Sequence, residues 1–252
     1  MAITIKSARE IELMRESCRL LSEVHDRLKE AIKPGISTYE INALGERLIR
    51  GYGCEPNFLN YNGYPASICV SVNDEVVHGI PKKERILEEG DIVSCDVGAY
   101  IGGFHGDCAA TFACGKISPE AQDLIDVTRQ SFFEGIKFAK EGCRLYDISA
   151  AIQGYVESHG CSIVREYVGH GIGTEMHESP EIPNYGHPGR GPRLLRGMTI
   201  AVEPMVNAGT AAIRQMPDGW TVRTADGKLA AHYENTLLIT DGEPEILTAP
   251  AI

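Results

Sequence analysis

The stretch DIVSCDVGAYIGGFHGDCAATF, residues 91–112, decides the fold. It consists of two apolar, strand-like segments on either side of a glycine turn, which predicts an antiparallel hairpin. Asp96 and Asp107 lie inside these segments. Burying an ionised carboxylate without a partner is costly, so two carboxylates in an apolar sheet predict a compensating cation.

The position of the turn decides how the two acids face each other. With the turn centred between Ile101 and Gly102, Asp96 and Asp107 stand about five residues from the centre and directly opposite each other. Their Cβ atoms would then lie about 5 Å apart on one face of the hairpin. A pair at this distance can flank one or two metal ions, which lie roughly 3.5 to 4 Å apart in two-metal hydrolases.

The overall charge and hydropathy exclude several classes of protein. The chain of 252 residues has a formal net charge of −11, which disfavours nucleic-acid binding because phosphates require a basic face. No segment offers the roughly 20 uninterrupted apolar residues of a membrane span. The charged N-terminus also lacks the apolar core of a signal peptide. We therefore expect a cytoplasmic protein with no membrane partner and no specific nucleic-acid partner.

Two helices are predicted before the first strands. Residues 7–31 place apolar side chains mostly three or four positions apart, which is typical of an amphipathic helix. A break at Pro34-Gly35 follows, and the next residues, STYE at 37–40, resemble a capping box. They predict a second helix that runs to about Gly51.

The chain contains an internal repeat at a shift of 107 residues. Residues 33–54 and 140–161 are identical at seven of 22 aligned positions, which is several times the one or two that composition would give by rough estimate. The same shift places Glu203 at the position of Asp96, so the acid-bearing strand recurs.

The repeat predicts an α/β fold built of two pseudo-symmetric halves, at about residues 7–112 and 116–240. Each half would hold a helix pair and an antiparallel sheet, with the strand-borne acids converging on the symmetry axis. We expect one catalytic domain over residues 1–252.

The second half contains an insertion of about twenty residues. The counterpart of Asp107 would fall near position 214, but the next strand-borne acid is Glu234. The inserted segment holds the only tryptophan, Trp220, and its Asp226-Gly227 pair predicts a hairpin turn. Such insertions often determine specificity.

Three histidines add to the four acids. His170 and His177 lie seven residues apart in the glycine-rich segment YVGHGIGTEMHESP, and His78 ends an apolar strand in NDEVVHGIP. Four carboxylates and one imidazole form an oxygen-rich set that suits Mn, Fe or Co better than structural zinc. The set predicts metal-assisted hydrolysis.

The five residues Asp96, Asp107, His170, Glu203 and Glu234, with the surrounding motifs HGD, GHGIG and EPMVNAG, resemble those of the methionine aminopeptidases. The resemblance runs from about residue 3 to residue 248 and is closest to the short bacterial type I enzymes. It implies the pita-bread fold, which agrees with the pseudo-twofold repeat.

The resemblance also implies roles for these five residues. Asp107 and Glu234 would bridge two divalent ions, drawn from Co, Mn, Fe, Zn or Ni. Asp96 would bind one ion, and His170 and Glu203 would complete the other. Glu203 would also be the general base.

Further positions of the family motif imply a substrate site. His78 and His177 would position the scissile amide and stabilise the tetrahedral intermediate. The pocket for the methionine side chain would be lined by Phe58, Tyr61, Tyr64, Cys69, Met176 and Trp220. Two positions depart from many relatives: Met176 replaces an aromatic residue, and Asn235 replaces a histidine next to Glu234.

The predicted activity is removal of the initiator methionine from proteins and peptides whose second residue is small. The partners would be nascent polypeptides and peptides with N-terminal methionine, with the ribosome as a further candidate, and the chain is expected to be a monomer. Two alternatives share the scaffold: a proline-directed peptidase and a non-catalytic binding protein. An iron oxygenase is disfavoured, because its facial triad needs two histidines to one carboxylate.

Overall fold

The hairpin predicted from residues 91–112 is the longest strand pair in the part of the chain that the structure describes. In the computed structural model, which describes residues 2–248, β4 (Ile92–Ile101) pairs antiparallel with β5 (Phe104–Ala113) along its whole length. Gly102 and Gly103 form the two-residue turn, with φ of 63° and 91°. A turn of this kind needs positive φ at both central residues, which glycine adopts without strain.

The prediction that Asp96 and Asp107 stand directly opposite each other was wrong. Asp96 pairs with Ala109, and Asp107 pairs with Gly98. The two turn glycines place the centre of the hairpin one residue later than expected, so the acids are offset diagonally by two residues. Because side chains alternate with a period of two along a strand, both acids still point to the same face.

Both halves of the chain contribute to one nine-stranded sheet. The remaining strands are β1 (Glu55–Pro56), β2 (Cys69–Val72), β3 (Glu75–Val77), β6 (Ser162–Ile163), β7 (Gly169–Gly171), β8 (Glu178–Ile182), β9 (Thr199–Val202), β10 (Met205–Asn207), β11 (Ile213–Gln215), β12 (Val222–Thr224), β13 (Ala230–His232), β14 (Glu234–Leu238) and β15 (Glu245–Ile246). The large sheet has the order β1-β4-β5-β14-β9-β7-β8, with β2 on β4 and β15 on β14. Two three-stranded sheets have the orders β13-β10-β6 and β11-β12-β3.

The two predicted N-terminal helices are confirmed as α1 (Ala8–Ala31) and α2 (Thr38–Gly51). The capping box of α2 is also confirmed. The backbone N–H of Glu40 donates to Ser37 Oγ over 3.2 Å, and the backbone N–H of Ser37 donates to Glu40 Oε2 over 2.9 Å. These reciprocal bonds satisfy N–H groups that have no partner inside the helix.

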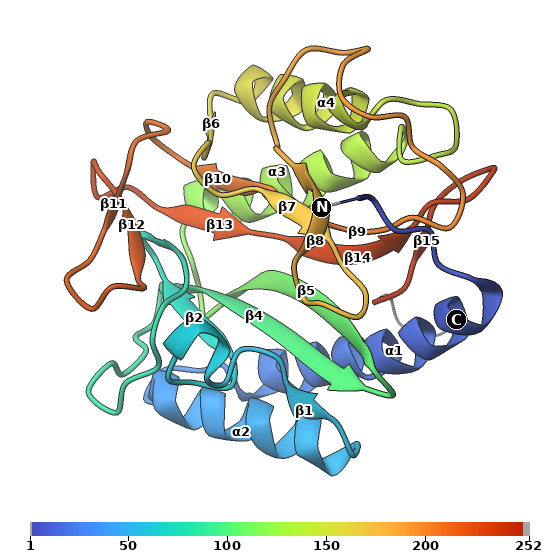
Figure 1. Cartoon of the computed structure of the whole chain (residues 1–252). Helices are drawn as coiled ribbons and strands as arrows, with labels where there is room; N and C mark the ends of the chain where they lie inside the picture. The colour runs from blue at the N-terminus through green and yellow to red at the C-terminus, as the bar shows by residue number, and fades with distance from the viewer. Residues whose placement is uncertain (1, 249–252) are drawn as a thin grey trace.

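The internal repeat is visible in the element boundaries. The second half holds α3 (Pro119–Ile136) and α4 (Leu145–Ser158), and a single 3₁₀ turn, η1 (Tyr61–Gly63), lies in the first half. A shift of 107 residues carries both ends of α2 onto those of α4, and both ends of β1 onto those of β6. Figure 1 shows the strands between the two helix pairs. The predicted α/β architecture with a repeated helix pair is therefore observed.

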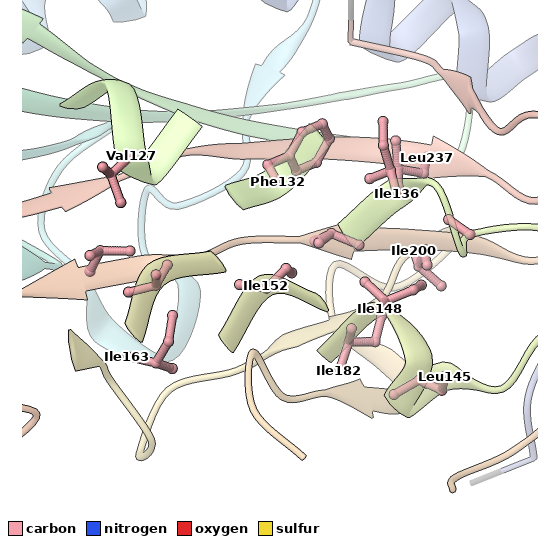
Figure 2. Close-up of a cluster of buried hydrophobic side chains, with 14 of the residues drawn as sticks. Val127, Phe132, Ile136, Leu145, Ile148, Ile152, Ile163, Ile182, Ile200 and Leu237 are labelled. Atoms are coloured by element: carbon pink, nitrogen blue, oxygen red, sulfur yellow. The ribbon is translucent and has the colours of Figure 1, made fainter. Parts of the chain in front are cut away.

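Each half has its own hydrophobic core between its helices and the sheet. In the second half, Phe132 and Ile136 of α3 and Ile148 and Ile152 of α4 pack against Ile200 and other apolar strand residues, as Figure 2 shows. This burial anchors the helix pair on the sheet. Among residues 2–248, no helix combines the length and the apolar character needed to cross a membrane.

The insertion in the second half forms a hairpin, but not at the predicted turn. β11 and β12 are the paired strands, and Trp220 lies in the loop between them. Asp226-Gly227 instead joins β12 to β13, which belong to different sheets. The reason is that β12 forms its second pairing with β3 of the first half, so the chain leaves that sheet before β13.

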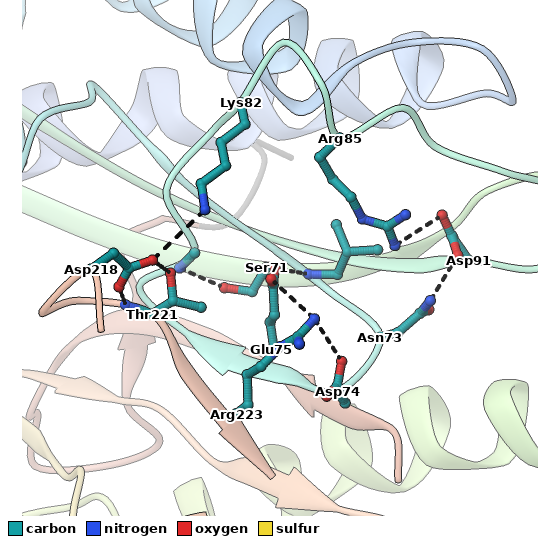
Figure 3. A network of polar contacts seen from close by, with 12 residues as sticks. Ser71, Asn73, Asp74, Glu75, Lys82, Arg85, Asp91, Asp218, Thr221 and Arg223 are labelled. Carbon is teal, nitrogen blue, oxygen red and sulfur yellow. Dashed lines mark hydrogen bonds and ion pairs between the residues drawn. The ribbon is translucent and has the colours of Figure 1, made fainter. Parts of the chain in front are cut away.

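A polar network attaches this hairpin to the first half (Figure 3). Arg223 of β12 lies 3.3 Å from Asp74 and 3.6 Å from Glu75. Lys82 lies 3.8 Å from Asp218, whose carboxylate also accepts hydrogen bonds from Thr221. The network thus fixes the loop that carries Trp220 against residues far away in the sequence.

Candidate metal centre and substrate pocket

Five neighbouring strands each bring one predicted ligand to the same region. In the sheet order β4-β5-β14-β9-β7, the residues are Asp96, Asp107, Glu234, Glu203 and His170, with Glu203 directly after the end of β9. The strand registers align them, since Ala109 opposes both Asp96 and Glu234. Asp107, Glu234 and His170 are buried, and Asp96 and Glu203 are half-buried.

The donor atoms of these residues lie close enough to share cations. One ligand atom each from Asp107, His170 and Glu234 fall within 4.8 Å of one another. His170 Nδ1 donates to the carbonyl of Gly171 over 2.9 Å, which leaves Nε2 free as a ligand atom, 3.8 Å from Glu203 Oε1. This geometry can hold an ion between strands from both halves.

Several buried oxygens in this cluster have no hydrogen-bond partner among the described residues. They are Asp96 Oδ1, Asp107 Oδ1 and Glu234 Oε1. A buried acceptor without a partner carries its full desolvation cost. Three such oxygens side by side fit the oxygen-rich coordination shell of divalent cations, so the residues present agree with the metal that the sequence predicts.

The electrostatics of the cluster point the same way. Burial raises the pKa of Asp107, Glu203 and Glu234 well above the ordinary carboxylate value, and the neighbouring acids raise it further. Burial lowers the pKa of His170 to about 3, so its imidazole is neutral at pH 7. Like charges this close cannot all ionise unless a cation compensates them.

All thirteen predicted site residues line one pocket of about 220 Å³. They are Phe58, Tyr61, Tyr64, Cys69, His78, Asp96, Asp107, His170, Met176, His177, Glu203, Trp220 and Glu234. Asn62 also lines the pocket and was not predicted. It lies in η1 with φ of 49°, and its sequence context is that of an ordinary polar loop residue.

Two neutral histidines stand beside the acids. His78 directly follows β3 and has φ of 58°, an unusual conformation for a side chain other than glycine. Burial lowers its pKa to about 4. His177 lies on the opposite wall, where its Nδ1 is hydrogen-bonded to the Tyr61 hydroxyl at 2.9 Å and its ring lies 4.1 Å from that of His170.

The remaining wall of the pocket is apolar. Phe58, Tyr64, Cys69 and Met176 form a buried cluster against which Trp220 packs. The rings of Tyr64 and Trp220 meet edge to face at 5.2 Å. The Tyr64 hydroxyl donates to the carbonyl of Gly79 over 2.8 Å, so its polar atom is satisfied outside the pocket.

The two departures from the family pattern lie in different places. Met176 is 2% exposed and belongs to the apolar wall. Asn235 points to the face of the sheet opposite Glu234, where its Oδ1 accepts a hydrogen bond from Thr248 Oγ1 over 2.7 Å.

One further residue of the centre was missed. His232 is buried at the end of β13, and its Nε2 lies 3.8 Å from Glu234 Oε2. The available signal was its position two residues before Glu234, which puts both side chains on the same face of an extended chain.

Comparisons with known proteins agree with this geometry. The sequence profile of metallopeptidase family M24 matches residues 12–241. A methionine aminopeptidase of Clostridium acetobutylicum is 55% identical over 246 residues, which cover 98% of each chain. The crystal structure of a methionine aminopeptidase from Thermotoga maritima has a TM-score of 0.97 at 44% identity, and the match covers 98% of this chain and 100% of that one.

A more distant likeness extends to another peptidase. The prolidase from Pyrococcus furiosus has a TM-score of 0.80 and is 22% identical, and the match covers 98% of this chain and 66% of the prolidase. At this identity the likeness shows the fold alone. With the closer matches, it confirms the predicted pita-bread fold.

Proposed function

Because this chain belongs to metallopeptidase family M24 and is a methionine aminopeptidase, we propose that the pocket described above releases the initiator methionine when the second residue is small. The observation that carries the proposal is the convergence of five acid or imidazole side chains from five neighbouring strands. Few structural roles would justify so many buried ionisable groups beside one apolar pocket.

The proposed metal centre holds two divalent ions. Asp107 and Glu234 lie centrally and would contact both ions, Asp96 would hold one, and His170 with Glu203 would complete the other. When bound, such ions lower the pKa of a water molecule and polarise the scissile carbonyl. The unpartnered oxygens of Asp96, Asp107 and Glu234 support this assignment.

Three side chains would handle protons and the substrate amide. Glu203 has a raised pKa and lies at the edge of the pocket, which suits a general base that accepts a proton from the attacking water. His78 and His177 would hydrogen-bond the scissile amide and the developing oxyanion from opposite walls. The contact between Tyr61 and His177 would hold that imidazole in place.

The apolar wall would select methionine. Aromatic rings, a thiol and a thioether suit an unbranched, polarisable side chain. A volume of about 220 Å³ admits one side chain of this size but leaves little room for bulkier ones.

Two alternatives share the fold and are disfavoured by specific observations. The prolidase likeness shows the fold alone, and that chain is longer than this one. A non-catalytic scaffold would have no need for four buried carboxylates around unsatisfied oxygens.

The substrates would be nascent polypeptides and peptides with N-terminal methionine. We place the reaction in the cytoplasm, where new chains carry that residue, with the ribosome as a candidate partner and the monomer as the active form. Support comes from the net charge of −11, which offers no broad basic surface.

The test is methionine release by metal-stripped protein from Met-Gly-Met-Met, Met-Leu-Met-Met and a Gly-Pro dipeptide, with Mn, Fe or Co added back. We expect metal-dependent cleavage of the glycine peptide and at least about tenfold slower cleavage of the leucine peptide. Cleavage of only the Gly-Pro dipeptide would replace the proposal with the proline-directed alternative. No cleavage by folded protein that binds no metal would leave the scaffold alternative.

A further inference from the structure

His232 is held rigidly at the centre of the molecule. It is 2% exposed and pairs with Met205 across β10. Its backbone N–H donates to Thr111 Oγ1 over 2.9 Å, and the same hydroxyl donates to the carbonyl of His232 over 2.9 Å. These contacts fix the backbone on both sides of the imidazole, so the direction of the ring is set by the fold.

The Nε2 atom of His232 points at the acids of the metal centre. It lies 3.9 Å from Glu203 Oε2 and 3.8 Å from Glu234 Oε2. Ligand atoms of Asp96, His232 and Glu234 also fall within 4.8 Å of one another. This cluster is distinct from the cluster of Asp107, His170 and Glu234, with which it shares only Glu234.

These separations suit ligands around an ion better than hydrogen bonds. A nitrogen-to-oxygen hydrogen bond is about 2.7 to 3.2 Å long. Two atoms that each lie roughly 2.1 Å from one ion are separated by roughly 3 to 4 Å. Nε2 has no hydrogen-bond partner among residues 2–248, whereas a histidine with only a structural role in a core normally has one.

We propose that His232 Nε2 is a sixth protein ligand of the centre and binds the same divalent ion as Asp96 and Glu234. The inference rests on the proposed function, because it needs the metal centre. Each ion would then have one imidazole, from His170 or from His232. The ion beside Asp96 would gain a nitrogen ligand, which favours Fe, Co, Ni or Zn over Mn.

The competing explanation is that His232 only donates a hydrogen bond to the acids. His232→Gln separates the two, because the glutamine amide can donate to a carboxylate but is a poor metal ligand. The matched control is His25→Gln. His25 is an imidazole on α1 whose Nε2 lies 3.6 Å from Cys108 Sγ, and it belongs to neither candidate cluster.

The experiment counts coordinated imidazoles on wild-type protein loaded with two equivalents of Co, by X-ray absorption, and measures both dissociation constants by calorimetry. We expect two imidazoles in wild type and one in His232→Gln, with the weaker ion bound at least about tenfold less tightly. His25→Gln should match wild type.

The imidazole count on wild type does not depend on any variant folding. Two ions with one imidazole would overturn the role of His232 and leave the proposed function intact. Unchanged binding and coordination in His232→Gln would do the same. No uptake of any ion by folded wild type would instead overturn the metal centre itself.

Discussion

The repeated and the unrepeated parts of the chain make different contributions to the pocket. The shift of 107 residues that maps α2 onto α4 also brings Asp96 to the position of Glu203. Residues 58–64 and the β11–β12 hairpin break this symmetry. Where the first half has η1 and its aromatic residues, the corresponding positions 165–171 carry β7 and His170.

This difference teaches how the site is organised. The repeated scaffold brings charged side chains from both halves to one place, where only a cation can compensate them. The divergent segments supply the uncharged wall of Phe58, Tyr61, Tyr64 and Trp220. We infer that the repeat carries the reaction and the divergent segments carry selection.

Breaking the repeated part should have the largest effect. Asp107→Asn removes a charged oxygen ligand from the central strand β5, so we expect methionine release from Met-Gly-Met-Met to fall by at least about 100-fold. Metal uptake measured by calorimetry should fall with it. Asp226→Asn changes an exposed carboxylate in the insertion and should behave as wild type. Near-normal activity in Asp107→Asn would show that the reaction does not depend on the repeated acids.

Removing the metal should destabilise the repeated part in a pH-dependent way. Burial raises the pKa of Asp96 to about 7, so its contribution to stability is present at low pH and is lost as pH rises through 7. Above pH 6.5 the buried histidines, with lowered pKa values, are neutral in both states. Calorimetry of chelated protein should therefore show Tm falling between pH 6.5 and 7.5.

Metal should abolish this dependence, because a bound cation favours the ionised carboxylates. Each proton held only by the folded protein corresponds to about 1.4 kcal/mol per pH unit. A Tm that rises over the same interval in the chelated protein would contradict the electrostatic account.

Loosening the divergent hairpin should have a moderate effect on selection. Arg223→Met removes the ion pairs to Asp74 and Glu75 that attach β12 to β3. We expect KM for Met-Gly-Met-Met to rise roughly two- to fivefold with little change in kcat. Arg214→Met, at the position opposite Arg223 on β11, serves as the control. Equal effects of both substitutions would mean that the network does not position Trp220.

The smallest effect should come from the helix caps, where the two copies differ. Ser37 accepts a hydrogen bond from the backbone of Glu40, whereas Arg144 at the repeated position has no side-chain acceptor. Ser37→Ala should lower the free energy of unfolding by about 1 kcal/mol in urea titrations and leave peptide selectivity unchanged. A larger loss in Arg144→Ala would reverse the comparison.

The fold was largely predictable because its signals are local. Capping boxes, helical periodicity and the repeat each depend on residues near one another in sequence. The turn register failed because either of two adjacent positions could centre the hairpin, and positive φ at both Gly102 and Gly103 decided between them. The Asp226-Gly227 turn was misassigned because the partner of β12 is β3, more than a hundred residues away.

The site was predictable to different degrees. Asp96 and Asp107 are out of place in apolar strands and could be identified from chemistry alone. The apolar wall could not, since Phe58 and Tyr64 would pass as core or loop residues without the family resemblance. His232 was missed because a histidine in a short apolar strand looks like an ordinary core residue, and only its distance to Glu203 and Glu234 reveals its surroundings.

The most direct test of this division of labour is the ratio of kcat/KM for Met-Gly-Met-Met to that for Leu-Gly-Met-Met, measured in wild type and Trp220→Ala. Loss of the indole opens the wall that contacts the methionine side chain, so the ratio should fall at least about tenfold while the leucine peptide is still cleaved. If Trp220→Ala slowed both peptides equally, the divergent hairpin would not carry selection and the account would be contradicted.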